Sequence, residues 1–197
     1  MSVVQGNQGA EKQGETLAAS LPLSMDQLSK IATSKAWESV METLTNDPTV
    51  SKSPSAGKMA DQEILRNLEK MIPGRLEIMN REGRTGYVDV TVNDGRGDSL
   101  LAVTIQKWKP GSQELVPLFR NGKKIPGGGK IVTRMAPVQG QSDIMQWEAD
   151  VLYDDGRRVL ISELNSSSFG TPATRKDPVF SMEQIKSMAL DRGWRQS

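Results

Sequence analysis

The sequence contains no cysteine and no histidine. Without cysteine, the chain forms no disulfide, thiolate nucleophile, cysteine-ligated zinc site or lipid attachment at a cysteine. Without histidine, it lacks the commonest general base and the commonest transition-metal ligand. These two absences exclude most hydrolase and metalloenzyme designs, and they leave a hard cation bound by carboxylates as the remaining type of metal site.

The chain also has few aromatic residues, a small net charge and no long apolar segment. The 25 Lys and Arg residues nearly balance the 24 Asp and Glu residues, so we expect no nucleic-acid partner. No segment approaches the roughly 18 apolar residues that cross a bilayer, so we expect no membrane insertion. The first residues lack the basic start and apolar run of a signal peptide. We therefore predict an extracellular or cell-envelope location if an export signal was trimmed, and a cytoplasmic one otherwise.

Two segments far apart in the chain are closely similar: "SMDQLSKIATSKAW" at 24–37 and "SMEQIKSMALDRGW" at 181–194. Each begins with Ser followed three residues later by Gln, which is the pattern of a capping box. Each then carries apolar residues at helical spacing. A short apolar segment precedes each copy, at 2–7 and 160–165. We interpret the pair as a strand–loop–helix unit that occurs twice.

The chain divides into three predicted parts. Residues 1–38 are interpreted as a partial repeat, the closing strand and helix of a preceding unit. Residues 39–57 are rich in Pro, Ser and Thr without periodicity, which is typical of a linker. Residues 58–197 are interpreted as a complete domain. It opens with "ADQEILRNLEKMIPG" at 60–74, an amphipathic helix stopped by Pro-Gly.

After this helix, β-type segments alternate with turn signals. Tyr87, Asp89 and Thr91 alternate with valines, which predicts a strand with opposed polar and apolar sides. Residues 93–98 and 154–157 are hairpin connections. We predict an α+β fold: an antiparallel meander sheet of about four to six strands, with an amphipathic helix before it and a short capped helix after it. The expected strands are 75–80, 87–92, 99–108, 130–136, 145–153 and 158–165.

Several turn sequences resemble functional motifs. "GRGDS" at 95–99 matches an integrin-binding tripeptide, but its Gly and Asp residues are also those that a hairpin turn requires. "PGGGK" at 126–130 is followed by a strand, whereas a phosphate-binding loop continues into a helix. We therefore interpret both as turns and expect no cofactor and no metal. The turn aspartates lack the spacing of a calcium loop: Asp94, Asp98, Asp143, Asp154 and Asp155.

We expect partner binding through the loops 109–129 and 166–180 or through a sheet face. The tryptophans are an alternative binding platform, but we expect Trp147 in the core and Trp37 and Trp194 to anchor their helices. No Ser–Lys, Asp or Glu arrangement has a recognisable catalytic spacing. The candidate partner-binding residues are Trp108, Phe119, Arg120, Arg175 and Lys176.

The C-terminal segment carries a distinctive set of motifs. These are the Asp-Asp-Gly turn at 154–156, Asn165 at a strand end, the Pro-Ala-Thr-Arg-Lys-Asp-Pro loop at 172–178, and Trp194. The set resembles the closing segment of an uncharacterised α+β repeat domain of actinobacterial secreted and membrane-anchored proteins. "GYVDVTVNDGRGDSLLAV" is similar to that domain's opening. The resemblance implies a location outside the membrane and no defined substrate. Residues 1–38 depart from it, because they lack the Pro-Thr-Arg loop.

Three hypotheses follow. The first is a non-enzymatic interaction module of the cell envelope that binds a protein or wall component. The second is an assembly or structural domain in which strand 1–8 pairs with a sheet edge of another copy, because an isolated strand needs a partner for its amides. This would make the protein a homo-oligomer. The third is an enzyme that works without His and Cys.

Overall fold

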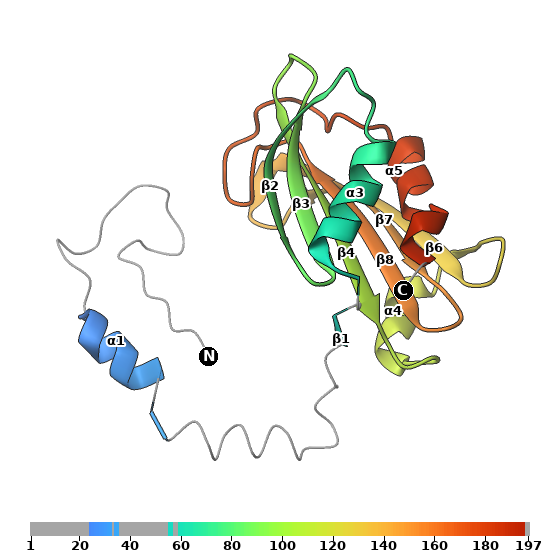
Figure 1. Ribbon diagram of the computed structural model, residues 1–197, viewed down its shortest axis with the longest axis horizontal. Helices are drawn as coiled ribbons and strands as arrows, with labels where there is room; N and C mark the ends of the chain where they lie inside the picture. Colours follow the sequence, from blue (N-terminus) through green and yellow to red (C-terminus); the bar gives the residue numbers. More distant parts are fainter. Residues whose placement is uncertain (1–23, 33, 36–54, 57–58, 196–197) are drawn as a thin grey trace. The chain divides into compact units, whose positions relative to one another are not determined.

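The computed structural model describes residues 24–32, 34–35, 55–56 and 59–195 (Figure 1). The chain separates into two compact units, Met1–Lys52 and Ser53–Ser197. Helix α1 (Met25–Ala32) belongs to the first unit. All the other elements described below belong to the second.

The two similar segments form helices with the same N-terminal cap. Before α1, the Ser24 amide donates to Gln27 Oε1 (2.7 Å) and the Gln27 amide donates to Ser24 Oγ (3.2 Å). Before α5 (Met182–Ala189), the Ser181 amide donates to Gln184 Oε1 (2.9 Å) and the Gln184 amide to Ser181 Oγ (3.3 Å). Each cap satisfies two otherwise unpaired groups of the first turn. Both predicted capping boxes are confirmed.

The rest of the predicted N-terminal copy lies outside the described residues. This applies to Trp37, to strand 1–8 and to most of the predicted linker 39–57. Within that linker the structure describes β1 (Ser55–Ala56), which pairs with the end of β4 in the second unit. The internal repeat as a whole remains a prediction.

The second unit is built on one antiparallel sheet, in the order β2-β3-β4-β8-β7-β6-β5. The fold is α+β, as predicted, and each of the strands expected from the sequence is present within a few residues. The short strand β5 was not expected, so the path has seven strands and not the predicted four to six. The bounds are β2 (Glu77–Arg84), β3 (Tyr87–Asn93), β4 (Asp98–Lys107), β5 (Lys123–Lys124), β6 (Lys130–Val138), β7 (Gln141–Leu152) and β8 (Arg157–Leu164).

The predicted single meander is wrong. In a meander of the predicted strands, β4 would pair with β6, the next predicted strand along the chain. Instead, β4 pairs with β8, so that two meanders, β2-β3-β4 and β6-β7-β8, meet at the centre of the sheet. Strand β4 has buried side chains on both of its faces, including Leu100, Leu101, Ala102 and Val103. A strand buried on both faces belongs in the middle of a sheet, with a neighbour on each side. The connection from β4 to β5 carries the chain past the positions of β8, β7 and β6 to the edge of the sheet.

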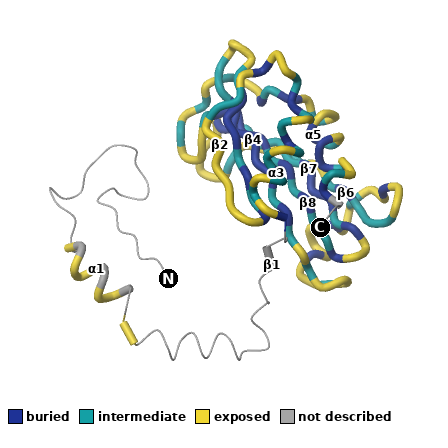
Figure 2. Tube along the Cα trace, viewed as in Figure 1, coloured by how far each residue is buried: buried dark blue, intermediate teal, exposed yellow. Residues whose placement is uncertain are grey.

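Two helices cover one face of this sheet: α3 (Asp61–Met71) and α5 (Figure 1). The apolar stripe predicted for α3 is confirmed, because Ile64 and Leu68 are fully buried. Facing these helices, valine, leucine and isoleucine side chains from β3, β4, β8 and β7 form cross-strand pairs, and much of β3, β4 and β8 is buried (Figure 2). This layer between sheet and helices is the main core.

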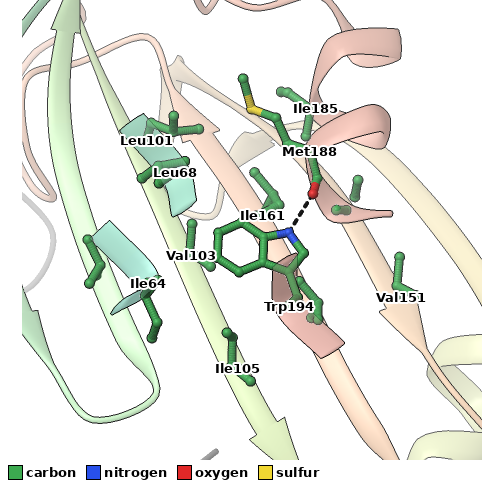
Figure 3. Packing of buried hydrophobic residues seen from close by; sticks show 14 of the residues in the cluster. Ile64, Leu68, Leu101, Val103, Ile105, Val151, Ile161, Ile185, Met188 and Trp194 are labelled. Atoms are coloured by element: carbon green, nitrogen blue, oxygen red, sulfur yellow. Dashed lines mark hydrogen bonds between the residues drawn. The ribbon is translucent and has the colours of Figure 1, made fainter. Parts of the chain in front are cut away.

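Trp194 closes the core at the C-terminal end. It lies in the short 3-10 helix η2 (Arg192–Arg195) after α5 and is fully buried. Its indole Nε1 donates to the Met188 carbonyl (2.6 Å), and the ring packs among apolar side chains of the sheet (Figure 3). The prediction that Trp194 anchors its helix is confirmed. Trp147 packs against the same core but is only partly buried.

The two motif-like turns are hairpin connections, as interpreted from the sequence. "GRGD" lies between β3 and β4, where Gly95 and Gly97 have φ of 84° and 119°. Only Gly adopts such angles without strain. "PGGG" joins β5 to β6, and a side chain at Gly129 would meet the Leu152 carbonyl.

Candidate functional site

The connection between β4 and β5 folds into a cavity at one end of the sheet. It contains the short helices η1 (Gln113–Leu115) and α4 (Val116–Phe119). The cavity has a volume of about 480 Å³, within the range of about 300–1,000 Å³ of ligand pockets. We call it the loop pocket. Its lining residues are Lys109, Gly111, Ser112, Gln113, Leu115, Val116, Phe119, Arg120, Lys130, Leu152, Tyr153, Asp154 and Gly156.

The walls of the loop pocket are held by contacts between distant parts of the chain. The Trp108 amide donates to the Gly156 carbonyl (2.8 Å), which joins the end of β4 to the β7–β8 turn. Gly156 has φ of 85°, and a side chain there would collide with the Trp108 carbonyl. Lys130 Nζ donates to the Phe119 carbonyl (3.3 Å). The walls of the pocket are therefore held together by contacts within the chain itself.

The chemistry of the loop pocket combines an apolar lining with positive charge. Leu115 and Phe119 are buried at its base. Lys109, Arg120 and Lys130 contribute three positive charges. The one carboxylate in the lining is that of Asp154. A ligand with an apolar group next to a negative charge matches this combination best.

Of the five predicted binding residues, the structure places Phe119 and Arg120 in the loop pocket. Trp108 lies next to it but does not line it: its indole Nε1 donates to Gln106 Oε1 (3.0 Å) and the residue is half-buried. Arg175 and Lys176 lie near the other end of β4, because Arg175 contacts Gly97 just before that strand begins. The predicted residues therefore do not form a single site.

Arg175 braces the loop 166–180 against the β3–β4 hairpin. Its guanidinium Nη1 donates to Asp94 Oδ1 (2.9 Å) and to the Gly97 carbonyl (3.2 Å). Lys176 is exposed beside it. Asn165 contributes to the same brace, because its Nδ2 donates to the Arg175 carbonyl (2.9 Å) and its Oδ1 accepts from the Met145 amide (2.8 Å). These contacts give the Pro-Thr-Arg loop a structural role.

The sheet face away from α3 and α5 carries a charged network. Arg158 donates through Nε and Nη2 to both carboxylate oxygens of Asp150 (2.8 and 2.7 Å), and through Nη1 to Gln106 (3.0 Å). Arg134 pairs with Glu148 (3.1 Å). Asp150 is fully buried beneath these side chains. In this part of the predicted binding face, the charged groups are therefore paired with one another within the sheet.

Sequence reasoning missed a buried carboxylate, Glu163, on the core side of β8. Its Oε1 lies 2.7 Å from Ser99 Oγ and accepts from the Val179 amide (2.7 Å). Its Oε2 accepts from the Phe180 amide (3.1 Å). Burial raises the pKa of Glu163 to about 7, against the hydrogen bonds from Ser99 and the two amides. The alternation of Val159, Ile161 and Glu163 along the strand was the available signal.

Among the described residues, no group of three or more acidic side chains lies close enough to hold a metal ion. Within the same residues, no helix is long and apolar enough to cross a membrane. No family model, curated protein or solved structure matches this chain.

Proposed function

We propose that the protein is a non-enzymatic binding module of the cell envelope. Its loop pocket receives a segment of a protein or wall component in which an apolar group is followed by a carboxylate. The observation that carries this proposal is the pocket itself, about 480 Å³ in volume, in the loop where partner binding was expected from the sequence.

We expect the base of the loop pocket to bind the apolar group of the ligand and the rim to bind its carboxylate. Val116, which is exposed beside the buried Leu115 and Phe119, offers an apolar surface on which a leucine- or phenylalanine-sized side chain is removed from water. At the rim, the planar guanidinium of Arg120 has the geometry for two parallel hydrogen bonds to a carboxylate. Lys109 adds positive charge that favours the approach of an anionic group.

Binding is favoured over catalysis by the types of residue in the loop pocket. Its ionisable side chains are lysines, an arginine, a tyrosine and Asp154. None of these forms the nucleophile, base and orienting group that acyl transfer requires. The assignment to the cell envelope rests on the resemblance of the C-terminal motifs to actinobacterial exported proteins.

The test uses short acetylated peptides that end in Leu or Phe, each made with a free carboxylate and with a C-terminal amide. Isothermal titration calorimetry measures their affinities for the whole protein. We expect the free carboxylates to bind with Kd in the range of about 0.01 to 1 mM, and Arg120→Glu to weaken binding about tenfold or more. Lys124→Glu makes the same charge change on β5, outside the lining of the loop pocket, and serves as the control.

Equal affinity for carboxylate and amide peptides, or an unchanged affinity after Arg120→Glu, contradicts the proposed recognition. Binding by none of the peptides contradicts it as well. The alternative hypothesis, in which strand 1–8 pairs with a sheet edge of another copy, concerns residues that lie outside the described ones and stays a prediction.

A further inference from the structure

A second pocket opens on the sheet face away from α3 and α5, on the side of the sheet formed by β2 and β3. Its volume is about 390 Å³, and it shares no residue with the loop pocket. Tyr87 and Asp89 point into it because the valines between them point to the core, as the alternation predicted. We call it the β3 pocket. Its lining residues are Asn80, Glu82, Arg84, Tyr87, Asp89, Thr91, Leu100, Ser167, Ser168 and Phe169.

One wall of the β3 pocket is formed by an irregularity in β2. The register between β2 and β3 shifts between Met79 and Glu82. Asn80, within this bulge, has φ of 47°, the one positive φ of a residue other than Gly in the described chain. Its Nδ2 donates to Thr91 Oγ1 (3.3 Å). Bulges redirect side chains and occur frequently beside functional sites.

The opposite wall is a serine-rich loop that is braced by its own hydrogen bonds. Thr91 Oγ1 donates to the Ser167 carbonyl (3.1 Å), which ties this loop to β3. Within the loop, Thr171 Oγ1 donates to the Ser168 carbonyl (2.9 Å) and accepts from the Ser168 amide (3.2 Å). The loop therefore has a defined conformation at the edge of the pocket.

This braced loop presents an aromatic ring to solvent. The residue is Phe169, which is 62% exposed, the largest exposure among the large apolar residues of the described chain. Leaving most of this ring in water is unfavourable, because apolar surface is more stable when it is buried. A ring held exposed by a structured loop, at the rim of a polar pocket, offers a flat apolar surface for stacking.

The base of the β3 pocket is polar. The Tyr87 hydroxyl and the Asp89 carboxylate both line it, and burial raises the pKa of Tyr87 to about 12, so that it keeps its proton. The Arg84 guanidinium lies over the Tyr87 ring, 4.5 Å from its centroid. Asp89 and Glu82 accept hydrogen bonds, whereas Arg84 and Asn80 donate them. Neighbouring donors and acceptors of this kind suit vicinal hydroxyl groups.

We propose that the β3 pocket binds a neutral saccharide. One sugar ring stacks its apolar face on Phe169, and its hydroxyls exchange hydrogen bonds with Asp89, Glu82 and Arg84. The two carboxylates outnumber the one guanidinium in the lining, which disfavours a phosphate, a nucleotide or a uronic acid. The inference does not depend on the loop pocket, because the two lie in different parts of the sheet.

The test follows ¹H–¹⁵N chemical shifts of the whole protein during titration with chitotetraose, cellotetraose and maltotetraose, and with an oligogalacturonate as the anionic comparison. We expect at least one neutral probe to shift the amides of Tyr87, Asp89 and Phe169 in a saturable way. Phe169→Ala should weaken binding about tenfold, and Asp89→Asn should weaken it by a smaller factor because the amide still accepts a hydrogen bond.

Leu118→Ala is the matched control, because Leu118 is also an exposed apolar residue (41%) but does not line the β3 pocket. It should leave saccharide affinity unchanged. The proposal is overturned if no neutral probe gives saturable shifts up to about 10 mM, if Phe169→Ala binds as tightly as the native protein, or if the oligogalacturonate binds best. The spectrum of each variant without ligand verifies that it is folded.

Discussion

The Glu163 carboxyl and the Ser99 hydroxyl face one another across β8 and β4, with 2.7 Å between Oε1 and Oγ. Ser99 Oγ also lies 2.5 Å from the Leu164 carbonyl. A hydroxyl has one proton and donates it to one acceptor. Ser99 therefore donates its proton either to Leu164 or to Glu163, and only the second bond favours the ionised carboxylate. Burial outweighs the hydrogen bonds to the carboxylate and raises the pKa of Glu163 to about 7.

The first prediction is that Glu163 makes the protein less stable as the pH rises. The folded protein keeps the Glu163 proton up to a pKa of about 7, whereas the ordinary pKa of a glutamate is 4.5. Between these values the native state binds more protons than the unfolded chain, so the free energy of unfolding falls with rising pH. The stabilisation is complete below the lower pKa and is lost above the higher one. Urea unfolding across this range measures the slope.

Glu163→Gln should reduce this slope, because a neutral amide imitates the protonated carboxyl at every pH. The nearby positive charge of Arg175, which favours the ionised carboxylate, remains in the variant. Glu163→Ala should instead destabilise the protein at all pH values, because the Val179 and Phe180 amides lose their acceptor. A slope that is the same in the native protein and in Glu163→Gln would show that another group controls this dependence.

The second prediction concerns Trp194 at the end of the core. Trp194→Ala should lower the free energy of unfolding by about 3 to 5 kcal/mol, because it leaves a cavity and the Met188 carbonyl loses one of its donors. Trp194→Phe should cost less, since most of the apolar contact is retained. Denaturant unfolding followed by far-ultraviolet circular dichroism measures both. A loss below about 1 kcal/mol for Trp194→Ala would contradict this packing.

The third prediction compares a buried ion pair with an exposed one. Asp150→Ala leaves Arg158 without its bidentate partner in a largely buried position, and should destabilise the protein by about 3 kcal/mol. Lys186→Ala breaks the surface pair with Glu183 and should change stability by less than about 1 kcal/mol. Similar losses in the two variants, measured by thermal and urea unfolding, would contradict the structural role of the Asp150 network.

The fourth prediction uses the two capping boxes. Ser181→Ala should destabilise the second unit by about 1 kcal/mol, because the Gln184 amide loses its acceptor at the start of α5. Ser24→Ala removes the same cap from α1, in the first unit. It should leave the unfolding of the second unit unchanged. Native-state hydrogen exchange at the amides of α5 and of the central strands reports each effect separately.

Local elements of this protein were predictable where a pattern has a single structural solution. Ser181 followed by Gln184 specifies a capped helix start, and the valines of β3 specify which side of that strand faces the core. The binding residues were less predictable. Phe119 and Arg120 lie together because they are close in the chain, whereas Arg175 turned out to brace the β3–β4 hairpin. Its ion-pair partner Asp94 is distant in sequence, and no local pattern identifies such a contact.

The sequence by itself determined the α+β class, the positions of the central strands and helices, and the two helix caps, because hydrogen bonds and side-chain alternation act over a few residues. Only the tertiary structure decided that β8 pairs with β4, that the loop pocket and the β3 pocket are separate, and that Glu163 is buried. Each of these depends on which distant segments meet. The favoured strand order depends on the total apolar surface that the whole sheet buries. This total cannot be evaluated from neighbouring residues alone.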